Sequence, residues 1–403
     1  MIFKPTLSIL IPTRNREDYA VQVIRHILKI SDARFELVIY DNSDTDRLKT
    51  LLSESLKDAR LKYFYNNDIL SFVDNFSLGI SQCEGEYVTI IGDDDGINPV
   101  IIDMAEWAYK AGIDAITPSL PLVYYWPNSG ATAQNDDGRL VMGEISCKAK
   151  LCHPGKEVIK LLKNGCQNYL SFNLAKAYHG MIKRTVLQEI KDRTGKFIGG
   201  LSPDIYLSIA ASLMVKKVLI IDYPLTISGI CKKSGSADSA TGKHTGKLEQ
   251  APHFKGHTTY AWSDKVPAFY CVETIWGDSA LAAIKDLELN SLLKYFNVDV
   301  ISAFCLKLHP QFREIILENL TKNYKVSKDS FLIKARMAMG FITGPYLAYV
   351  KAVKRHLLNR KGHTVFNTIP DIEAVSVIIQ NNIRDKNKLL LENINHLNES
   401  GTK

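Results

Sequence analysis

Residues 7–41 carry two apolar runs with a helical pattern between them, LSILIPTRNREDYAVQVIRHILKISDARFELVIYD. The first run ends at Ile11 and the second covers 35–40, and both have the length of a buried strand. Between them, residues 18–30 place apolar side chains at the spacing of an amphipathic helix. Two buried strands joined by a helix predict a parallel β-α-β unit.

The same alternation continues to residue 91. We expect a helix near 46–56, a strand at 61–65, a helix near 71–81 and a strand at 87–91. The predicted fold class is therefore α/β, with a mostly parallel, doubly wound, Rossmann-like sheet.

Beyond residue 100 the alternation of strand and helix patterns is less regular. We expect helices at 100–111 and 155–163 and after 183, short strands near 114–117, 121–126, 140–143 and 180–183, and a strand pair within 216–230. Residues 231–258 contain five lysines and three histidines but few large apolar groups, which is typical of a mobile lid or of an ordinary surface loop. From residue 265 the pattern becomes helical, which indicates a second module.

The composition excludes several classes of protein. With 403 residues and 46% hydrophobic residues the chain is long enough for a large domain and a smaller one. No apolar run approaches the roughly 18 residues of a membrane span, and the broken N-terminal run predicts a first strand, not a signal peptide. Seven cysteines without a C-x-x-C pair predict ordinary packing or surface thiols in a reducing cytoplasm.

Polar side chains follow the predicted strands. In doubly wound sheets ligands bind beyond the carboxyl ends of the strands. The residues at these ends are Pro12, Thr13 and Arg14 after the first strand, Asp41 after the second, and Asp93, Asp94 and Asp95 after the fourth. No G-x-G-x-x-G and no G-x-x-x-x-G-K is present, which excludes a dinucleotide fingerprint and a P-loop.

Three consecutive carboxylates repel one another, so a positive group, most simply a metal ion, is expected beside residues 93–95. Gly92 and Gly96 flank them and leave room for backbone to approach a ligand. The alternative is a solvated acidic turn that caps the helix after Pro99.

Four motifs occur in order: LSILIPTRNRE, VIYDNSDTD, NFSLGISQCEGEYVTIIGDDDGINP and SPD. Together they resemble the family 2 glycosyltransferases, which have a GT-A fold, over roughly residues 5–230. The resemblance implies a metal-dependent transfer of sugar from a nucleotide-sugar, with UDP as the default nucleotide, to a hydroxyl of a glycan or lipid-linked acceptor. It also implies inversion at the sugar carbon and a role in surface polysaccharide synthesis.

The resemblance also assigns roles to individual residues. Asp93 and Asp95 match the D-x-D motif that binds Mg²⁺ or Mn²⁺ in the family. Asp204, in a first helical turn, matches the family's catalytic base; without that role its charge would stabilise the helix dipole. The positions that match or neighbour nucleotide contacts are Pro12, Thr13, Arg14, Asp41, Asn75, Asp93 and Asp94. For Asp41 the structural alternative is an acceptor within the turn DNSD.

These expectations divide the chain into two domains and a lid. The catalytic domain is predicted at 1–264, with a nucleotide-sugar half at 1–112, an acceptor half at 113–230 and a lid at 231–258. In the lid, Lys232, Lys233, His244, His253 and His257 are candidates for closing on the diphosphate. A helical C-terminal module is predicted at 265–403.

Within that module, residues 334–361 hold seven Lys and Arg and no acidic residue, interleaved with apolar side chains. This pattern suits either peripheral contact with the inner face of an anionic membrane or an ordinary packed helix with its lysines in water. The terminal helical segment is a candidate for self-association. The net charge of +7 suits a phosphate-bearing ligand or a membrane, and no nucleic-acid-binding module is present.

Two rival functions remain. A glycosyltransferase-like module that binds nucleotide without turnover would have the same motifs. An acid-rich phosphohydrolase would need a nucleophilic aspartate after its first strand, where this chain has PTRNRE.

Overall fold

The computed structural model describes residues 4–130, 137–232, 245–248, 254, 260–350 and 363–400, with the side chains of 398–400 left aside. Most of the predicted lid and part of the basic stretch 334–361 therefore lie outside the described residues. Of the lid residues proposed above, Lys232 is described, whereas Lys233, His244, His253 and His257 are not.

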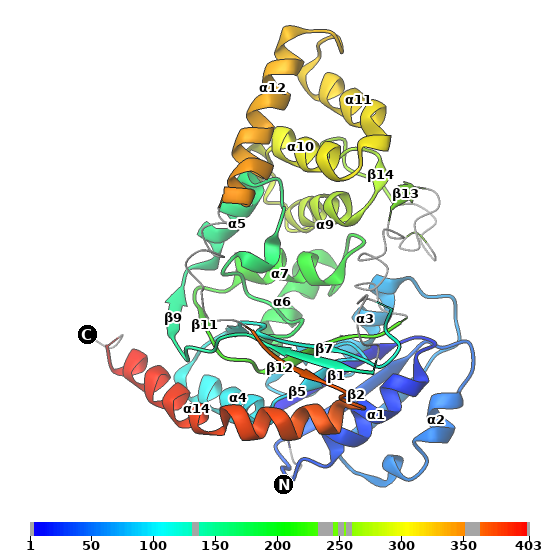
Figure 1. The fold of residues 1–403 in the computed structure, drawn as a ribbon, viewed down its shortest axis with the longest axis vertical. Coiled ribbons are helices and arrows are strands. Elements are labelled where there is room, and N and C mark those ends of the chain that lie inside the picture. The colour runs from blue at the N-terminus through cyan, green and yellow to red at the C-terminus, as the bar shows by residue number, and fades with distance from the viewer. Residues whose placement is uncertain are drawn as a thin grey trace.

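A mixed eight-stranded sheet forms the centre of the molecule (Figure 1). Its strands, in spatial order, are β3 (Leu61–Tyr65), β2 (Phe35–Asp41), β1 (Leu7–Thr13), β4 (Tyr87–Ile90), β10 (Met181–Lys183), β6 (Ala115–Pro118), β11 (Val218–Ile221) and β9 (Ala149–Cys152). Strands β10 and β9 run antiparallel to their neighbours, and all the other pairings are parallel. The predicted mostly parallel sheet is confirmed.

A second sheet lies beside the first. It contains β15 (Thr364–Asn367), β8 (Arg139–Met142), β7 (Leu122–Tyr125), β12 (Thr226–Ile230) and β5 (Gly96–Ile97). Strand β5 directly follows the three aspartates and pairs antiparallel with β12, so residues 226–230 lie next to the acidic turn. A short ladder joins β13 (Gly246–Lys247) and β14 (Phe269–Tyr270).

Helices cover both faces of the main sheet because its strands bury side chains on both sides. The helices of the first 220 residues are α1 (Glu17–Leu28), α2 (Arg47–Leu51), α3 (Phe72–Ser81), α4 (Val100–Ala111), α5 (Pro154–Lys163), α6 (Arg184–Thr194) and α7 (Pro203–Met214). Within β1, Leu10 joins an apolar cluster with α3 and α7, whereas Ile9 and Ile11 join another with α1 and α4. This alternation produces the doubly wound arrangement.

The later helices add to the helices that cover the two faces of the main sheet. They are α9 (Val272–Asp286), α10 (Val298–Leu308), α11 (Arg313–Tyr324), α12 (Phe331–Phe341) and α14 (Ile372–Ser400). Helices α9 and α10 share the apolar cluster of α7, while α14 returns to the opposite face and packs beside α1 and α4 (Figure 1). Short helical turns occur at Ser55–Lys57, Tyr169–Ser171, Asn290–Tyr295, Pro310–Phe312 and Ile342–Tyr346.

The helical character expected after residue 265 is confirmed, whereas the domain boundary at 264 stays a prediction. Among the described residues, none of the helices combines the length and the apolar character that crossing a bilayer requires.

Candidate active site

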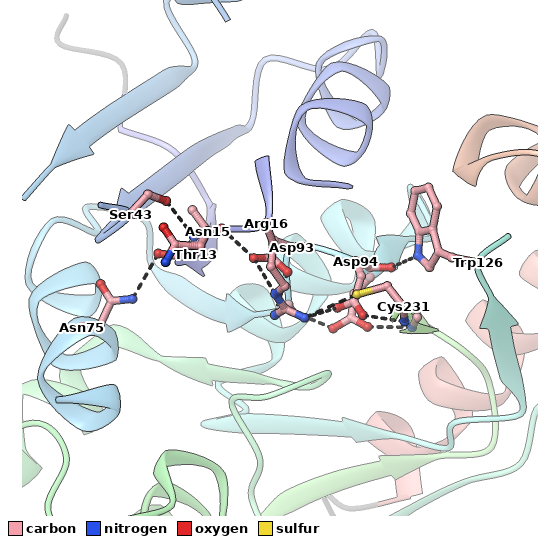
Figure 2. A network of polar contacts seen from close by, with 12 residues as sticks. Thr13, Asn15, Arg16, Ser43, Asn75, Asp93, Asp94, Trp126 and Cys231 are labelled. Carbon is pink, nitrogen blue, oxygen red and sulfur yellow. Dashed lines mark hydrogen bonds and ion pairs between the residues drawn. The ribbon is translucent and has the colours of Figure 1, made fainter. Parts of the chain in front are cut away.

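The carboxyl ends of β1, β2 and β4 bring the predicted strand-end residues together, as a parallel arrangement requires. The Thr13 hydroxyl donates a hydrogen bond of 2.5 Å to Oδ2 of Asp93. The Asn75 side chain, from α3, donates to the Thr13 carbonyl at 3.4 Å. Three separate segments of the chain thus meet at one buried point (Figure 2).

Arg16 supplies the positive group that the three aspartates were expected to need. Its Nε donates to Oδ2 of Asp93 at 3.1 Å, and its terminal nitrogens lie 2.7 Å from Oδ1 of Asp93 and 3.6 Å from Oδ1 of Asp94. Figure 2 shows the guanidinium between the two carboxylates. The preceding residue, Asn15, has φ 55°, which turns the chain between β1 and α1.

The electrostatics of this group follow from its burial. Burial raises the pKa of Asp93 against the opposing pull of Arg16, and it raises the pKa of Asp94 to about 7. Burial lowers the pKa of Arg16, but the two carboxylates outweigh it and raise that pKa above its ordinary value. The guanidinium therefore stays charged and offsets part of the repulsion among the aspartates.

Asp95 is held by backbone and by aromatic donors. Its oxygens accept from the amides of Gly92 at 2.6 Å and Gly229 at 2.7 Å, and the Tyr178 hydroxyl donates at 3.2 Å. Nε2 of His179 lies 3.5 Å from the same carboxylate. The side chain is 2% exposed, so its orientation is set by the fold.

Asp94 is tied to the second sheet. The Cys231 amide donates to its carboxylate at 3.1 Å, and the indole of Trp126 donates to its carbonyl at 2.7 Å (Figure 2). The turn of aspartates is therefore clamped from β12 and from the end of β7.

The aspartates have the donor chemistry of a site for a small divalent cation, because carboxylate oxygens are the ligands that Mg²⁺ and Mn²⁺ prefer. Oδ1 of Asp93 is buried and accepts no hydrogen bond, although it is ion-paired with Arg16. A Cβ on Gly92 would lie 3.0 Å from carboxylate oxygens of Asp94 and Asp95, so glycine keeps this space open. The residues fit a metal, but binding by Asp93 and Asp95 stays a prediction.

Gly96 has a different role from the one expected. A Cβ there would lie 2.8 Å from Cδ1 of Ile372, at the start of α14. This glycine therefore admits a packing helix and not a ligand.

Asp41 accepts a hydrogen bond within its own turn, which is the structural alternative to a role in binding a nucleotide. It is fully buried, with one oxygen accepting from the Ser43 amide at 2.9 Å and the other from the Tyr63 hydroxyl at 2.6 Å. Burial and the nearby Asp41 carboxylate raise the pKa of Tyr63. The role of Asp41 in binding a nucleotide base stays a prediction.

Two other predicted nucleotide contacts lie near this point. Arg14 points to Asn42 and Asp44, with both distances at 3.2 Å. Pro12 is part of β1, paired in register with Tyr40. Arg14 is thus paired with a surface acid, Asp44, and its contact with a nucleotide stays a prediction.

Asp204 lies in the first turn of α7 and is partly exposed. The Tyr169 hydroxyl donates to Oδ2 at 2.5 Å, and the Ser202 hydroxyl donates to Oδ1. Ser202 immediately precedes α7, but its side chain makes no cap hydrogen bond and binds Asp204 instead. Burial lowers the pKa of nearby Lys176 to about 8, although the charge of Asp204 opposes this shift.

Two tyrosines connect the aspartate turn to Asp204. Tyr178 donates to Asp95, and Tyr169 donates to Asp204. After burial and Asp204, Tyr178 also contributes to the raised pKa of Tyr169. The segment 169–178 thus donates to both Asp204 and Asp95, and a common site for the candidate base and the acidic turn stays a prediction.

Sequence analysis did not predict several residues of the site. Only Arg16 had a local signal, since it lies in the same PTRNRE motif from which Arg14 was chosen. Trp126, Tyr169, Tyr178 and Cys231 reach the site through tertiary folding and carry no motif of their own.

Comparison with known proteins shows that the residues around this site resemble a known family. The family described as "Glycosyl transferase family 2" matches residues 8–154, which contain β1, β2, β4 and the three aspartates. An uncharacterised glycosyltransferase of Rickettsia conorii is 33% identical over 90 residues, which are 22% of this chain and 15% of that protein.

Two further relatives have more specific names. The GalNAc(5)-diNAcBac-PP-undecaprenol beta-1,3-glucosyltransferase of Campylobacter jejuni is 32% identical over 93 residues, 23% of this chain and 30% of that protein. Glycosyltransferase GlyG of Streptococcus pneumoniae is 26% identical over 98 residues, 24% of this chain and 33% of that protein. The chain thus spans a third or less of the length of these relatives.

Among solved structures, S. aureus TarS 1–349 aligns over 79% of this chain and 92% of that chain, with 13% identity and a TM-score of 0.42. The assignment therefore depends on the match to residues 8–154 and on the observed α/β sheet. Through these residues the chain is similar to glycosyl transferase family 2.

Proposed function

We propose that this chain is a glycosyltransferase that moves a sugar from a nucleotide-sugar, with UDP as the nucleotide, to a hydroxyl of a glycan or lipid-linked oligosaccharide. The observation that carries this proposal is the junction of Thr13, Arg16 and the three aspartates at the carboxyl ends of β1 and β4, within the residues that match the family. The name of the Campylobacter jejuni relative, which contains PP-undecaprenol, supports a lipid-linked acceptor, and we infer a role in assembling surface polysaccharides.

The proposed nucleotide site lies along the ends of β1, β2 and β4. Asp41 and Thr13 are proposed to contact the base and Asp93 the ribose, with Asn75 and Asp94 adjacent. Asn75 supports this because Oδ1 of its buried amide accepts no hydrogen bond, so it has an acceptor available. Arg14 and Pro12 border the same edge of the sheet.

The chemistry proposed is a single displacement with inversion. Asp204 takes the proton of the acceptor hydroxyl while that oxygen attacks the anomeric carbon, and the bond from this carbon to the diphosphate oxygen breaks. Tyr169 and Ser202 orient the Asp204 carboxylate through their hydrogen bonds. Partial exposure of Asp204 leaves it accessible to an acceptor.

A divalent cation is proposed at Asp93 and Asp95. When bound, Mg²⁺ or Mn²⁺ would supply positive charge where the diphosphate becomes negative. Arg16 contributes a fixed positive charge at the same place, and Tyr178 and the amides of Gly92 and Gly229 keep Asp95 in position.

Contact with a membrane surface is also proposed, at the cytoplasmic face. The residues from α12 onward expose large apolar side chains: Phe331, Leu332, Met339, Ile342, Tyr346, Leu347 and Tyr349. Lys334 and Arg336 lie among them. An exposed apolar stripe with cations is typical of helices that bind anionic lipid surfaces.

The first experiment measures nucleotide binding and release. The protein is incubated with a panel of nucleotide-sugars, with Mn²⁺ or with EDTA, and free nucleoside diphosphate and thermal stabilisation are followed. We expect one nucleotide to bind in the presence of metal, with loss of binding in Asp93→Ala and Asp95→Ala. Glu17→Ala, an acidic residue in the adjacent first turn of α1, is the matched control.

The outcomes separate the rival functions. Absence of binding to any nucleotide contradicts the proposal. Binding that never leads to transfer, even with lipid-linked acceptors, supports a non-catalytic module. Release of inorganic phosphate from simple phosphate esters supports a phosphohydrolase.

A further inference from the structure

Three metal-ligating side chains meet at the junction of α9 and α10, apart from the aspartate turn. Ligand atoms of Cys271, Glu273 and His309 lie within 4.8 Å of one another. Cys305, in the last turn of α10, is the candidate fourth ligand, because its thiol lies close enough to that of Cys271 to affect the pKa of Cys271. Within the described parts of the chain this is the one cluster of three such residues with the spacing of a metal site.

Local structure explains why these residues converge. Cys271 immediately precedes α9, so Cys271 and Glu273 lie at the start of that helix. Cys305 is in the last turn of α10 and His309 follows its end, with the His309 amide donating to the Cys305 carbonyl at 2.8 Å. A spacing of four residues places Cys305 and His309 on the same side, one turn apart.

The surroundings of the cluster exclude solvent. Cys271 and Cys305 are fully buried. The ring of Phe269 contacts the His309 imidazole at 5.9 Å between centroids and stacks on Phe312 at 4.3 Å. No substrate reaches thiols buried in this way, so a nucleophilic role for Cys271 is excluded.

We propose that Cys271, Cys305, His309 and Glu273 bind one structural Zn²⁺ ion. Two sulfurs, an imidazole nitrogen and a carboxylate oxygen form a tetrahedral set of the kind that zinc prefers, whereas the all-carboxylate set at residues 93–95 suits harder ions. Zinc would replace the hydrogen bond of 3.0 Å between His309 Nε2 and Glu273 Oε2. Both sulfurs bind as thiolates, and thiol protons still present leave to solvent.

The side chains of Cys271 and His309 shift each other's pKa. Burial alone would raise the pKa of Cys271, but hydrogen bonds with Cys305 and His309 lower it to about 7. Hydrogen bonds with Cys271 and Glu273 raise the pKa of His309 to about 10.

The zinc ion would join the start of α9 to the end of α10, and α9 supports the candidate base. The Glu273 carbonyl accepts from the Gln167 side chain at 3.2 Å. One turn further along α9, Trp276 packs edge-on against Tyr169 at 4.9 Å, and Tyr169 donates to Asp204. The proposed ion is therefore a structural element behind the acceptor half of the site.

Elemental analysis tests this proposal directly. The full-length chain, free of any affinity tag and dialysed without added metal, is expected to contain about one zinc per chain. Cys305→Ser and His309→Gln should lose that zinc, whereas Cys166→Ser, a buried cysteine outside the cluster, should keep it. Asp95→Asn should also keep it, because the aspartate turn is a separate site.

A second measurement does not depend on variants that may fold poorly for other reasons. Wild-type protein stripped of metal and loaded with Co²⁺ should show the sulfur-to-cobalt charge-transfer bands and intense visible bands of a tetrahedral thiolate site. Zn²⁺ should also raise the melting temperature of the stripped protein.

Two results would overturn the proposal. One is a wild-type protein that takes up neither Zn²⁺ nor Co²⁺ at this cluster. The other is a metal-free protein two hydrogens lighter than expected, which would identify a Cys271–Cys305 disulfide. None of these measurements uses a nucleotide-sugar, so they are independent of the proposed transferase activity.

Discussion

Arg16 shows how a single side chain balances the acidic turn. Asp93 is fully buried, and its carboxylate contacts the Arg16 guanidinium through both oxygens. Removal of one partner of a buried ion pair leaves an uncompensated charge, which typically costs about 3–5 kcal/mol. The guanidinium is therefore expected to matter for stability as well as for ligand binding.

We predict that Arg16→Ala lowers the free energy of unfolding by about 3 kcal/mol, measured by urea denaturation. The control is Arg14→Ala, whose charged partner Asp44 is exposed, and its effect should stay within about 1 kcal/mol. Adding Asp93→Asn to Arg16→Ala should recover much of the loss, because the unpaired charge is removed. Equal stability of the Arg16 and Arg14 variants would contradict this account.

Asp204 is the residue on which the proposed mechanism depends. We predict that Asp204→Asn retains donor binding, seen as thermal stabilisation by the nucleotide, and lowers the rate of transfer by about 10²- to 10⁴-fold. The amide keeps the size of the side chain but cannot accept the acceptor's proton. Ser202→Ala, which removes one orienting donor, should reduce transfer much less. Unchanged transfer by Asp204→Asn would remove this residue from the mechanism.

At the scale of elements, β12 is the strand that shapes the acidic turn. Its Gly229 amide donates to Asp95, and the amide of Cys231, just beyond its end, donates to Asp94. A Cβ on Gly229 would lie 1.8 Å from the Asp94 carbonyl oxygen. Only glycine allows the strand to come this close without displacing the turn.

Gly229→Ala is therefore expected to destabilise the protein by about 3 kcal/mol and to weaken nucleotide binding, because strand and turn must separate. Gly155→Ala, in the first turn of α5, is the control, since a Cβ there would lie 3.9 Å from the nearest atom. Urea denaturation and the nucleotide-induced thermal shift measure both effects. A Gly229→Ala protein as stable as the Gly155→Ala protein would show that the turn has more freedom than the structure indicates.

At the scale of the whole molecule, helices from the end of the chain lie on opposite sides of the sheet. Helix α14 buries Val375, Ile383 and Leu390 beside α1 and α4, whereas α12 lies at the far end of the stack formed by α9 and α10 (Figure 1). The exposed apolar side chains of α12 are therefore remote from the sheet and available to a surface outside the molecule.

The exposed apolar residues of α12 are expected to bind vesicles of anionic lipid more tightly than vesicles of zwitterionic lipid. Salt should weaken this binding. Phe331→Ser combined with Met339→Ser should reduce cosedimentation with anionic vesicles several-fold. Val377→Ser combined with Leu389→Ser, at exposed apolar positions of α14, is the matched control. If the two double variants cosediment equally, α12 is not the membrane contact.

The local patterns were enough to predict the early elements. The apolar runs and helical spacings of the first hundred residues correspond to β1–β4 and α1–α4, since period and turn chemistry are properties of neighbouring residues. The strand-end positions of Thr13, Asp41 and Asp93 followed from the same logic. The choice between Arg14 and Arg16 did not, because it depends on the backbone of Asn15.

Contacts between distant segments were decided only by the tertiary structure. Several contacts join residues far apart in the chain: the return of α14 to the sheet, the hydrogen bonds from β12 to the acidic turn, the Tyr169–Asp204 contact and the grouping of Cys271 and Glu273 with His309. The sequence alone determined an α/β sheet with acidic strand ends, because strands and turns arise from local periodicity. Which groups face those acids depended on long-range packing, and no local pattern encodes it.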